Sequence, residues 1–108
     1  MAKLTRTLNC GFEAAVNKVK NAVMNGSVSA TLEDEWYSSC GASRCAVMVF
    51  ERYSYAGGNR VSMNVTLYQD GNSPVRLCAI TSGGSQAMFF KVNTLGEEAF
   101  LDTLREAL

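Results

Sequence analysis

The chain contains no histidine among its 108 residues, so the side chain that most often serves as a general base near neutral pH is missing. A Ser–His–Asp or Cys–His catalytic arrangement within one chain is therefore excluded. Catalysis would need carboxylates, a cysteine activated by lysine or arginine, or a site shared between two chains. No recognisable motif of these kinds occurs, and the sequence favours a protein that is not an enzyme.

The residues that would bind a metal or form a disulfide are the four cysteines, Cys10, Cys40, Cys45 and Cys78. Zinc sites use two close pairs of cysteine or histidine, and this chain has one close pair, Cys40 with Cys45. Cys45 and Cys78 lie in apolar strand patterns, where a thiol behaves as a small hydrophobic side chain. We therefore expect no metal and no cofactor. A disulfide between Cys40 and Cys45 would form only in an oxidising compartment.

Two further stretches carry the polar groups that a binding site needs. Glu51 interrupts an apolar run and is followed by Arg52. If the carboxylate faces the helices, it would anchor a polar group in a pocket, but the favoured interpretation is a solvated residue near the end of a strand. The Ser-Gly-Gly-Ser stretch at 82–85 offers backbone donors for an anion. Known phosphate loops open directly into a helix, whereas an apolar segment follows here, so a plain connection between strands is favoured.

These residues belong to, or lie beside, a long β-hairpin predicted from Cys45 to Gln69, which the rest of the chain must cover. The second arm alternates strictly, with polar residues between its apolar ones, which indicates one buried face. Its apolar residues are Val61, Met63, Val65 and Leu67. The first arm is apolar on both sides as far as Phe50, which is typical of a strand that is covered on both faces.

The length of the hairpin loop decides which side of the first arm faces the core. A loop of three or five residues would place Val47 and Val49 beside the apolar residues of the second arm, with Met48 and Phe50 on the opposite face. A loop of four residues would exchange the two sets. Gly57-Gly58-Asn59 is compatible with either, because glycine and asparagine tolerate positive φ, so the sequence leaves both registers open.

The remaining elements are predicted from periodicity and from turn residues. The first helix is expected to have Asn9 as its N-cap and to stop at Asn25-Gly26, and the last helix is expected to begin with a capping box of Thr94 and Glu97. The other predicted elements are strands at 3–8, 27–37, 75–81 and 86–92, a small-residue loop at 38–43 and a turn at 70–74.

This order predicts a single α+β domain over residues 1–108, with a curved antiparallel sheet and two helices on one of its faces. A strand, a helix, four or five strands and a closing helix also occur in the TATA-binding-protein-like and helix-grip architectures, which is an analogy of element order. Two helices cover one face, so the displaced apolar trio of the first arm is expected to form a patch on the open face with Tyr68 and with Ile80 or Trp36. In the alternative interpretation, strand twist and long neighbours such as Arg52 and Arg76 cover these residues.

The expected function is therefore an interaction module that self-associates or binds a protein through the open sheet face. The alternative is a binding module for a small apolar or amphipathic ligand between helices and sheet. The candidate residues for the ligand site or interface are Met48, Phe50, Glu51, Arg52 and Tyr68.

The charge balance bears on partners and location. Ten basic residues match ten acidic ones with no basic cluster, so we expect no nucleic-acid partner. No apolar run approaches the roughly 18 residues of a membrane span, and residues 1–9 lack the apolar core of a signal peptide. We therefore expect no membrane partner and a cytoplasmic location.

Several strings carry a resemblance over nearly the whole chain, namely Glu51–Ser54, Gly58–Ser62, Ile80–Gln86, Phe89–Lys91 and Gly96–Leu101. Together they resemble a small bacterial family known only as a domain of unknown function. The resemblance implies a single-domain bacterial protein. It implies no catalytic or binding residues.

Overall fold

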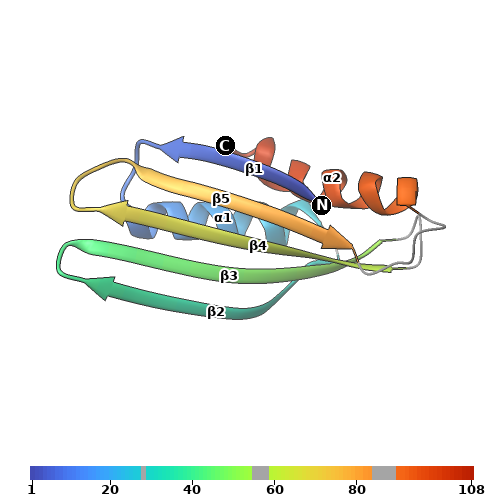
Figure 1. The fold of residues 1–108 in the computed structure, drawn as a ribbon, viewed down its shortest axis with the longest axis horizontal. Helices are drawn as coiled ribbons and strands as arrows, with labels where there is room; N and C mark the ends of the chain where they lie inside the picture. Colours follow the sequence, from blue (N-terminus) through green and yellow to red (C-terminus); the bar gives the residue numbers. More distant parts are fainter. Residues whose placement is uncertain (28, 55–58, 84–89) are drawn as a thin grey trace.

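The computed structural model describes residues 1–27, 29–54, 59–83 and 90–108, and these form an α+β fold of two layers (Figure 1). One layer is a five-stranded antiparallel sheet with the strand order β1-β5-β4-β3-β2. The other layer consists of two helices on the same face of the sheet (Figure 1). In chain order the elements are β1 (Ala2–Leu8), α1 (Phe12–Gly26), β2 (Thr31–Cys40), β3 (Ser43–Ser54), β4 (Asn59–Asp70), β5 (Val75–Gly83) and α2 (Phe90–Arg105).

The core lies between the sheet and the helices, because alternate residues of each central strand and one stripe of each helix point into the same layer. Burying each large apolar side chain contributes about 1.5–3 kcal/mol. The larger buried side chains are Met48, Phe50, Val61, Met63, Val65 and Leu67 on β3 and β4, Phe12, Val16, Val19 and Val23 on α1, and Phe100, Leu101 and Leu104 on α2. Neither described helix is long and apolar enough to cross a membrane.

The pairing of β3 with β4 selects one of the two hairpin registers. Ser54 pairs with Asn59, so residues 55–58 form the connection, which is the four-residue alternative. Met48 and Phe50 therefore share a face with the apolar residues of β4, and both are fully buried under the helices. A shift of one residue would have turned them outward.

This register corrects the composition of the expected open-face patch. Met48 and Phe50 do not contribute to the open face. The trio that points away from the helices is Cys45, Val47 and Val49, whose side chains are half-buried in their own sheet.

The predicted cap of α1 is wrong at its start. The N-cap is Gly11 in an extended conformation without a side-chain cap, and its carbonyl accepts a hydrogen bond from the Ala15 amide at 3.0 Å. Asn9 lies outside the helix. The helix ends at Gly26 as predicted, but the next residue, Ser27, is extended and not left-handed.

The predicted strand at 86–92 is wrong at 90–92, and the predicted capping box of Thr94 and Glu97 is wrong, because α2 already begins at Phe90. The part of that strand at 86–89 lies outside the described residues. A short apolar run does not distinguish a strand from a buried helix, which explains the error. Glu97 therefore lies inside the helix, and its carboxylate accepts a hydrogen bond from the Gly83 amide at 2.7 Å and pairs with the Met1 ammonium at 2.9 Å.

The first β-hairpin lies three or four residues later than predicted. β2 covers Thr31–Cys40 in place of 27–37, and the small residues at 38–40 pair with β3 and do not form a loop. The turn is confined to Gly41 and Ala42. Gly41 supplies the positive φ of 58° that so short a connection requires, which allows the polar residues before it to stay in the strand.

A β-bulge in β2 decides which side chains of this edge strand face the helices. The pairing with β3 shifts between Leu32 and Asp34. Leu32 shares the helix side of the sheet, and after the extra residue Glu35 and Tyr37 return to that side. Trp36 consequently points to the open face, as Asp34 does.

Candidate functional site

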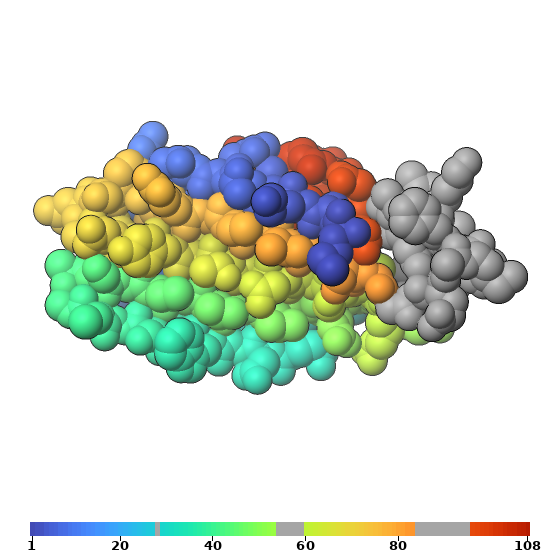
Figure 2. Space-filling view, in the orientation of Figure 1, coloured from blue at the N-terminus to red at the C-terminus, as the bar shows by residue number. Residues whose placement is uncertain are grey.

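The open face of the sheet carries side chains of all five strands and has no helix over it in the described part of the chain. Figure 2 shows this face, with the strands following one another from blue β1 to blue-green β2. Its large apolar side chains are strongly exposed at four positions, with 60% for Trp36, 44% for Tyr68 and 39% for Ile80 among the central rows, and 49% for Tyr53 near the end of β3. Val47 and Val49 lie among them and are half-buried.

The strand register arranges this face into rows, because paired residues of neighbouring strands point to the same side. Each row crosses the sheet from β1 through β5, β4 and β3 to β2. The first row is Lys3, Ile80, Asn64, Val49 and Asp34; the second is Thr5, Cys78, Thr66, Val47 and Trp36; the third is Thr7, Arg76, Tyr68, Cys45 and Ser38. The β1–β5 side thus carries positive charge and the β2 side carries negative charge.

Two hollows lie on the two halves of this face. One, of about 590 Å³, lies at β1, β5 and β4 and is lined by Thr5, Thr66, Tyr68 and Cys78 among others. The other, of about 230 Å³, lies at β2 and β3 beside Asp34, Trp36, Val47 and Val49. Each half of the open face, on either side of β4, therefore has both an exposed large side chain and a hollow.

The remaining predicted site residues are divided between the two faces. Glu51 lies on the open face near the end of β3, where its carboxylate pairs with Arg60 at 3.3 Å. Tyr68 lies on the open face. Arg52 lies on the helix side, with its guanidinium 4.9 Å from the centre of the Phe100 ring, and burial lowers its pKa. Arg52 therefore does not cover the open-face patch.

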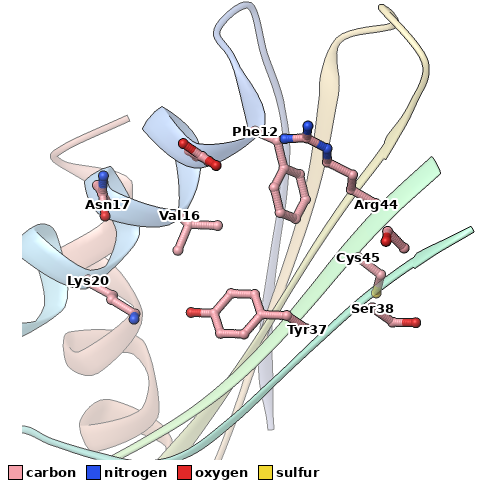
Figure 3. A pocket seen from close by; sticks show the side chains of 10 residues that line it. Phe12, Val16, Asn17, Lys20, Tyr37, Ser38, Arg44 and Cys45 are labelled. Carbon is pink, nitrogen blue, oxygen red and sulfur yellow. The ribbon is translucent and has the colours of Figure 1, made fainter. Parts of the chain in front are cut away.

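The structure also contains a groove that the sequence analysis did not identify. It has a volume of about 490 Å³ and lies between the first turns of α1 and the β2–β3 hairpin (Figure 3). Phe12 and Val16 provide apolar surface on the helix side. The Arg44 guanidinium lies 5.9 Å from the centre of the Phe12 ring, a cation–π distance. Tyr37 extends into the groove from β2, as Figure 3 shows.

A hydrogen-bonded network connects the two walls of the groove. Lys20 pairs with Glu35 at 2.9 Å, and the Tyr37 hydroxyl donates to the same carboxylate oxygen at 2.5 Å. The hydrogen bond from Tyr37, followed by that from Lys20, lowers the pKa of the Glu35 carboxyl. The hydrogen bond to Glu35, followed by that with Tyr37, raises the pKa of the Lys20 ammonium. The bulge in β2 makes this network, because it turns Glu35 and Tyr37 towards α1.

The chemistry available in the groove is recognition of a small molecule. Lys20 is already neutralised by Glu35, whereas Arg44 forms no ion pair within the described ranges. An organic anion with an apolar body would match a guanidinium above an aromatic ring. Residues 1–27, 29–54, 59–83 and 90–108 contain no cluster of three cysteine or acidic side chains that could hold a metal ion. All four cysteines are free, and Cys40 is exposed.

The sequence predicts several residues of the open face but does not predict the groove. The sequence predicts Tyr68, with either Ile80 or Trp36, for the open face, and the register places all three there. The groove residues Lys20 and Arg44 were missed. The groove depends on the bulge in β2, and no feature of the sequence pattern indicates that bulge.

Comparison with known proteins gives the chain a family but no activity. No curated protein matches the chain. A family model matches residues 1–108, and its description is a family of unknown function, DUF6054. The match covers the whole of the chain described above, so the protein is a member of the DUF6054 family.

Proposed function

We propose that the protein is a non-enzymatic interaction module whose open sheet face binds a protein, either another copy of the chain or a different one. The observation that carries the proposal is the exposure of Trp36, Tyr68 and Ile80 together on one sheet face, around the half-buried Val47 and Val49. Burying one large apolar side chain is worth about 1.5–3 kcal/mol, so five of them drive association. Tryptophan and tyrosine are also the residues that most often dominate interface energetics.

The proposal extends to the architecture and the setting of the protein. The element order of one strand, one helix, four strands and one helix supports a TATA-binding-protein-like or helix-grip arrangement by analogy. Exposed, free Cys40 suits a reducing compartment, which supports a cytoplasmic location. The proposed bacterial origin rests on the resemblance of the sequence strings alone.

Photo-crosslinking from single positions tests the proposal. A photoreactive amino acid at Thr66, in the middle of the open face, should give a discrete adduct in cells. The matched control is Lys18, which is exposed on α1 and should give none. The adduct is identified by mass spectrometry and reproduced with purified components. Absence of an adduct from Thr66, or equal adducts from both positions, would contradict the proposal.

The groove supports a second candidate, a binding site for a small apolar or amphipathic ligand. The supporting observation is the Arg44 guanidinium above the Phe12 ring beside about 490 Å³ of space. Native mass spectrometry of freshly purified protein should then show a retained small molecule that is lost in Arg44→Ala. A spectrum of ligand-free protein for both would exclude this candidate.

A further inference from the structure

This inference rests on the proposed role of the open sheet face. We propose that the partner of this face is a second copy of the chain, related by a twofold axis that runs parallel to β4 between the two stacked sheets. Such an axis reverses the strand order across the interface. β1 of one copy then lies over β2 of its partner, β5 lies over β3, and β4 lies over β4.

The rows of the open face are electrostatically complementary to themselves under this operation. Lys3 and Asp34 occupy the two ends of one row, at β1 and β2. The axis places Lys3 over the partner's Asp34, and it does so twice in each dimer. It also places Ile80 over the partner's Val49, so the charged ends enclose apolar pairs.

The shapes of the two halves of the face are complementary in the same way. Trp36 is the most exposed large hydrophobic side chain of the described strands, and the axis places it over the partner's Thr5, at the larger hollow. Ile80 is placed over the smaller hollow beside the partner's Val47 and Val49. Trp36 and Ile80 of one copy therefore each face a space in the other, whereas Tyr68, on the central strand, lies over the partner's Tyr68.

The alternative twofold axis, perpendicular to the strands, lacks this match. It would place β1 over β1 and β5 over β5, so that the edge with Lys3 and Arg76 faces itself. It would likewise place the edge with Asp34 over itself. With this axis through the second row, Lys3 would lie over the partner's Thr7 and Asp34 over the partner's Ser38, so no opposite charges would meet; the axis parallel to β4, which pairs Lys3 with Asp34, is preferred.

The face is large enough for a specific interface. A fourth, shorter row of Ser82, Ser62, Glu51 and Thr31 lies beside the first, so five strands spaced about 4.8 Å apart and four rows spaced about 6.8 Å apart give a footprint of roughly 24 by 27 Å, or about 650 Å² per copy. Standard interfaces bury about 800 Å² per partner. Stacked sheets lie about 10 Å apart with their strands rotated by about 30°, so the axis is parallel to β4 to within about 15°, and the central rows stay in register.

The intrinsic fluorescence of Trp36 reports directly on this contact, because Trp36 is the single tryptophan of the chain. As the full-length protein is concentrated, sedimentation velocity should show dimers, and the Trp36 emission should shift to the blue over the same range. Trp36→Ala should weaken the dimer by about a hundredfold or more, because each dimer contains the anchor twice. The control is Met24→Ala, an exposed large hydrophobic side chain on α1, which should leave the dissociation constant unchanged.

A charge-reversal mixture tests the orientation. Lys3→Glu and Asp34→Lys should each weaken self-association by about tenfold, because each creates two repulsive pairs per dimer. Mixing the two variants should restore association as a heterodimer, in which both pairs are attractive. Within one chain the two residues lie on opposite edge strands, about 19 Å apart at four strand spacings, which exceeds the Debye length, so rescue reports contact between copies.

The outcomes separate this inference from the proposed function. A dimer whose Trp36 emission does not change, or variants that mixing does not rescue, would overturn the arrangement. A strict monomer at high concentration would overturn the choice of partner. If Thr66 then still gave a crosslink to a different protein, the proposed function would stand without this inference; if it gave none, both would fall.

Discussion

The hairpin register decides which of two neighbouring residues, Phe50 or Val49, is buried under the helices, and therefore which of them contributes more to the free energy of unfolding. Phe50 is fully buried under the helices, and replacement by alanine removes most of its side chain from a packed core. Such substitutions cost about 3–5 kcal/mol. Because a domain of this size has a total stability of about 5–15 kcal/mol, Phe50→Ala should remove a large part of it.

Val49→Ala should cost about 1 kcal/mol or less in the monomer, since its side chain is half-buried on the open face and loses two methyl groups. The measurement is urea unfolding followed by circular dichroism, at protein concentrations low enough to keep the chain monomeric. The midpoint for Phe50→Ala should be far below that of Val49→Ala. Equal losses, or a larger loss for Val49→Ala, would refute the four-residue register and with it the identity of the open face.

Three other predictions concern the groove network of Glu35 and Lys20, the contact of Glu97 on α2 with β5, and the turn at Gly41. Folding lowers the pKa of Glu35, so the stability that this carboxylate contributes is present above its unfolded pKa and is lost as the pH falls through the folded pKa. Folding raises the pKa of Lys20, so the stability that this ammonium contributes is present below its unfolded pKa and is lost as the pH rises through the folded pKa. Urea titrations should therefore show wild type and Glu35→Gln converging in stability in acid, and a constant difference down to low pH would contradict this. Glu97→Ala should cost about 1.5–3 kcal/mol, because it leaves a β5 amide without its charged acceptor, and an unchanged melting temperature would argue against that hydrogen bond. Gly41→Ala should cost about 1–2 kcal/mol because φ is 58°, whereas Gly11→Ala, at a φ of −68° with open space around it, should cost less; equal effects in thermal melts would count against the turn geometry.

The parts of the fold that follow local periodicity could be predicted from the sequence. Alternation in β4 and the helical stripe of α1 each identify an element and its buried face without reference to other segments. The start of α2 at Phe90 was not predicted, because its first turns are apolar in a way that a strand also allows.

The parts of the site that depend on long-range geometry could not be predicted. Which of Phe50 and Val49 faces outward depends on the length of a loop that the sequence leaves ambiguous. The positions of Trp36 and Tyr37 depend on one inserted residue in β2, and a bulge has no sequence signature here. The groove could not be predicted either, because its walls are α1 and strand residues more than a dozen positions later, and the bulge decides which of those strand residues face α1.

Alkylation rates of native cysteines test most directly the central claim that the chain self-associates through its open sheet face. Cys78 lies on this face at the larger hollow, whereas Cys10 lies beyond the end of β1, outside the strand rows, and both are half-buried. With a maleimide reagent and detection by mass spectrometry, Cys78 should react more slowly in concentrated than in dilute protein, while the rate for Cys10 stays the same. A Cys78 rate that is independent of concentration, or an equal slowing of Cys10, would contradict self-association through this face.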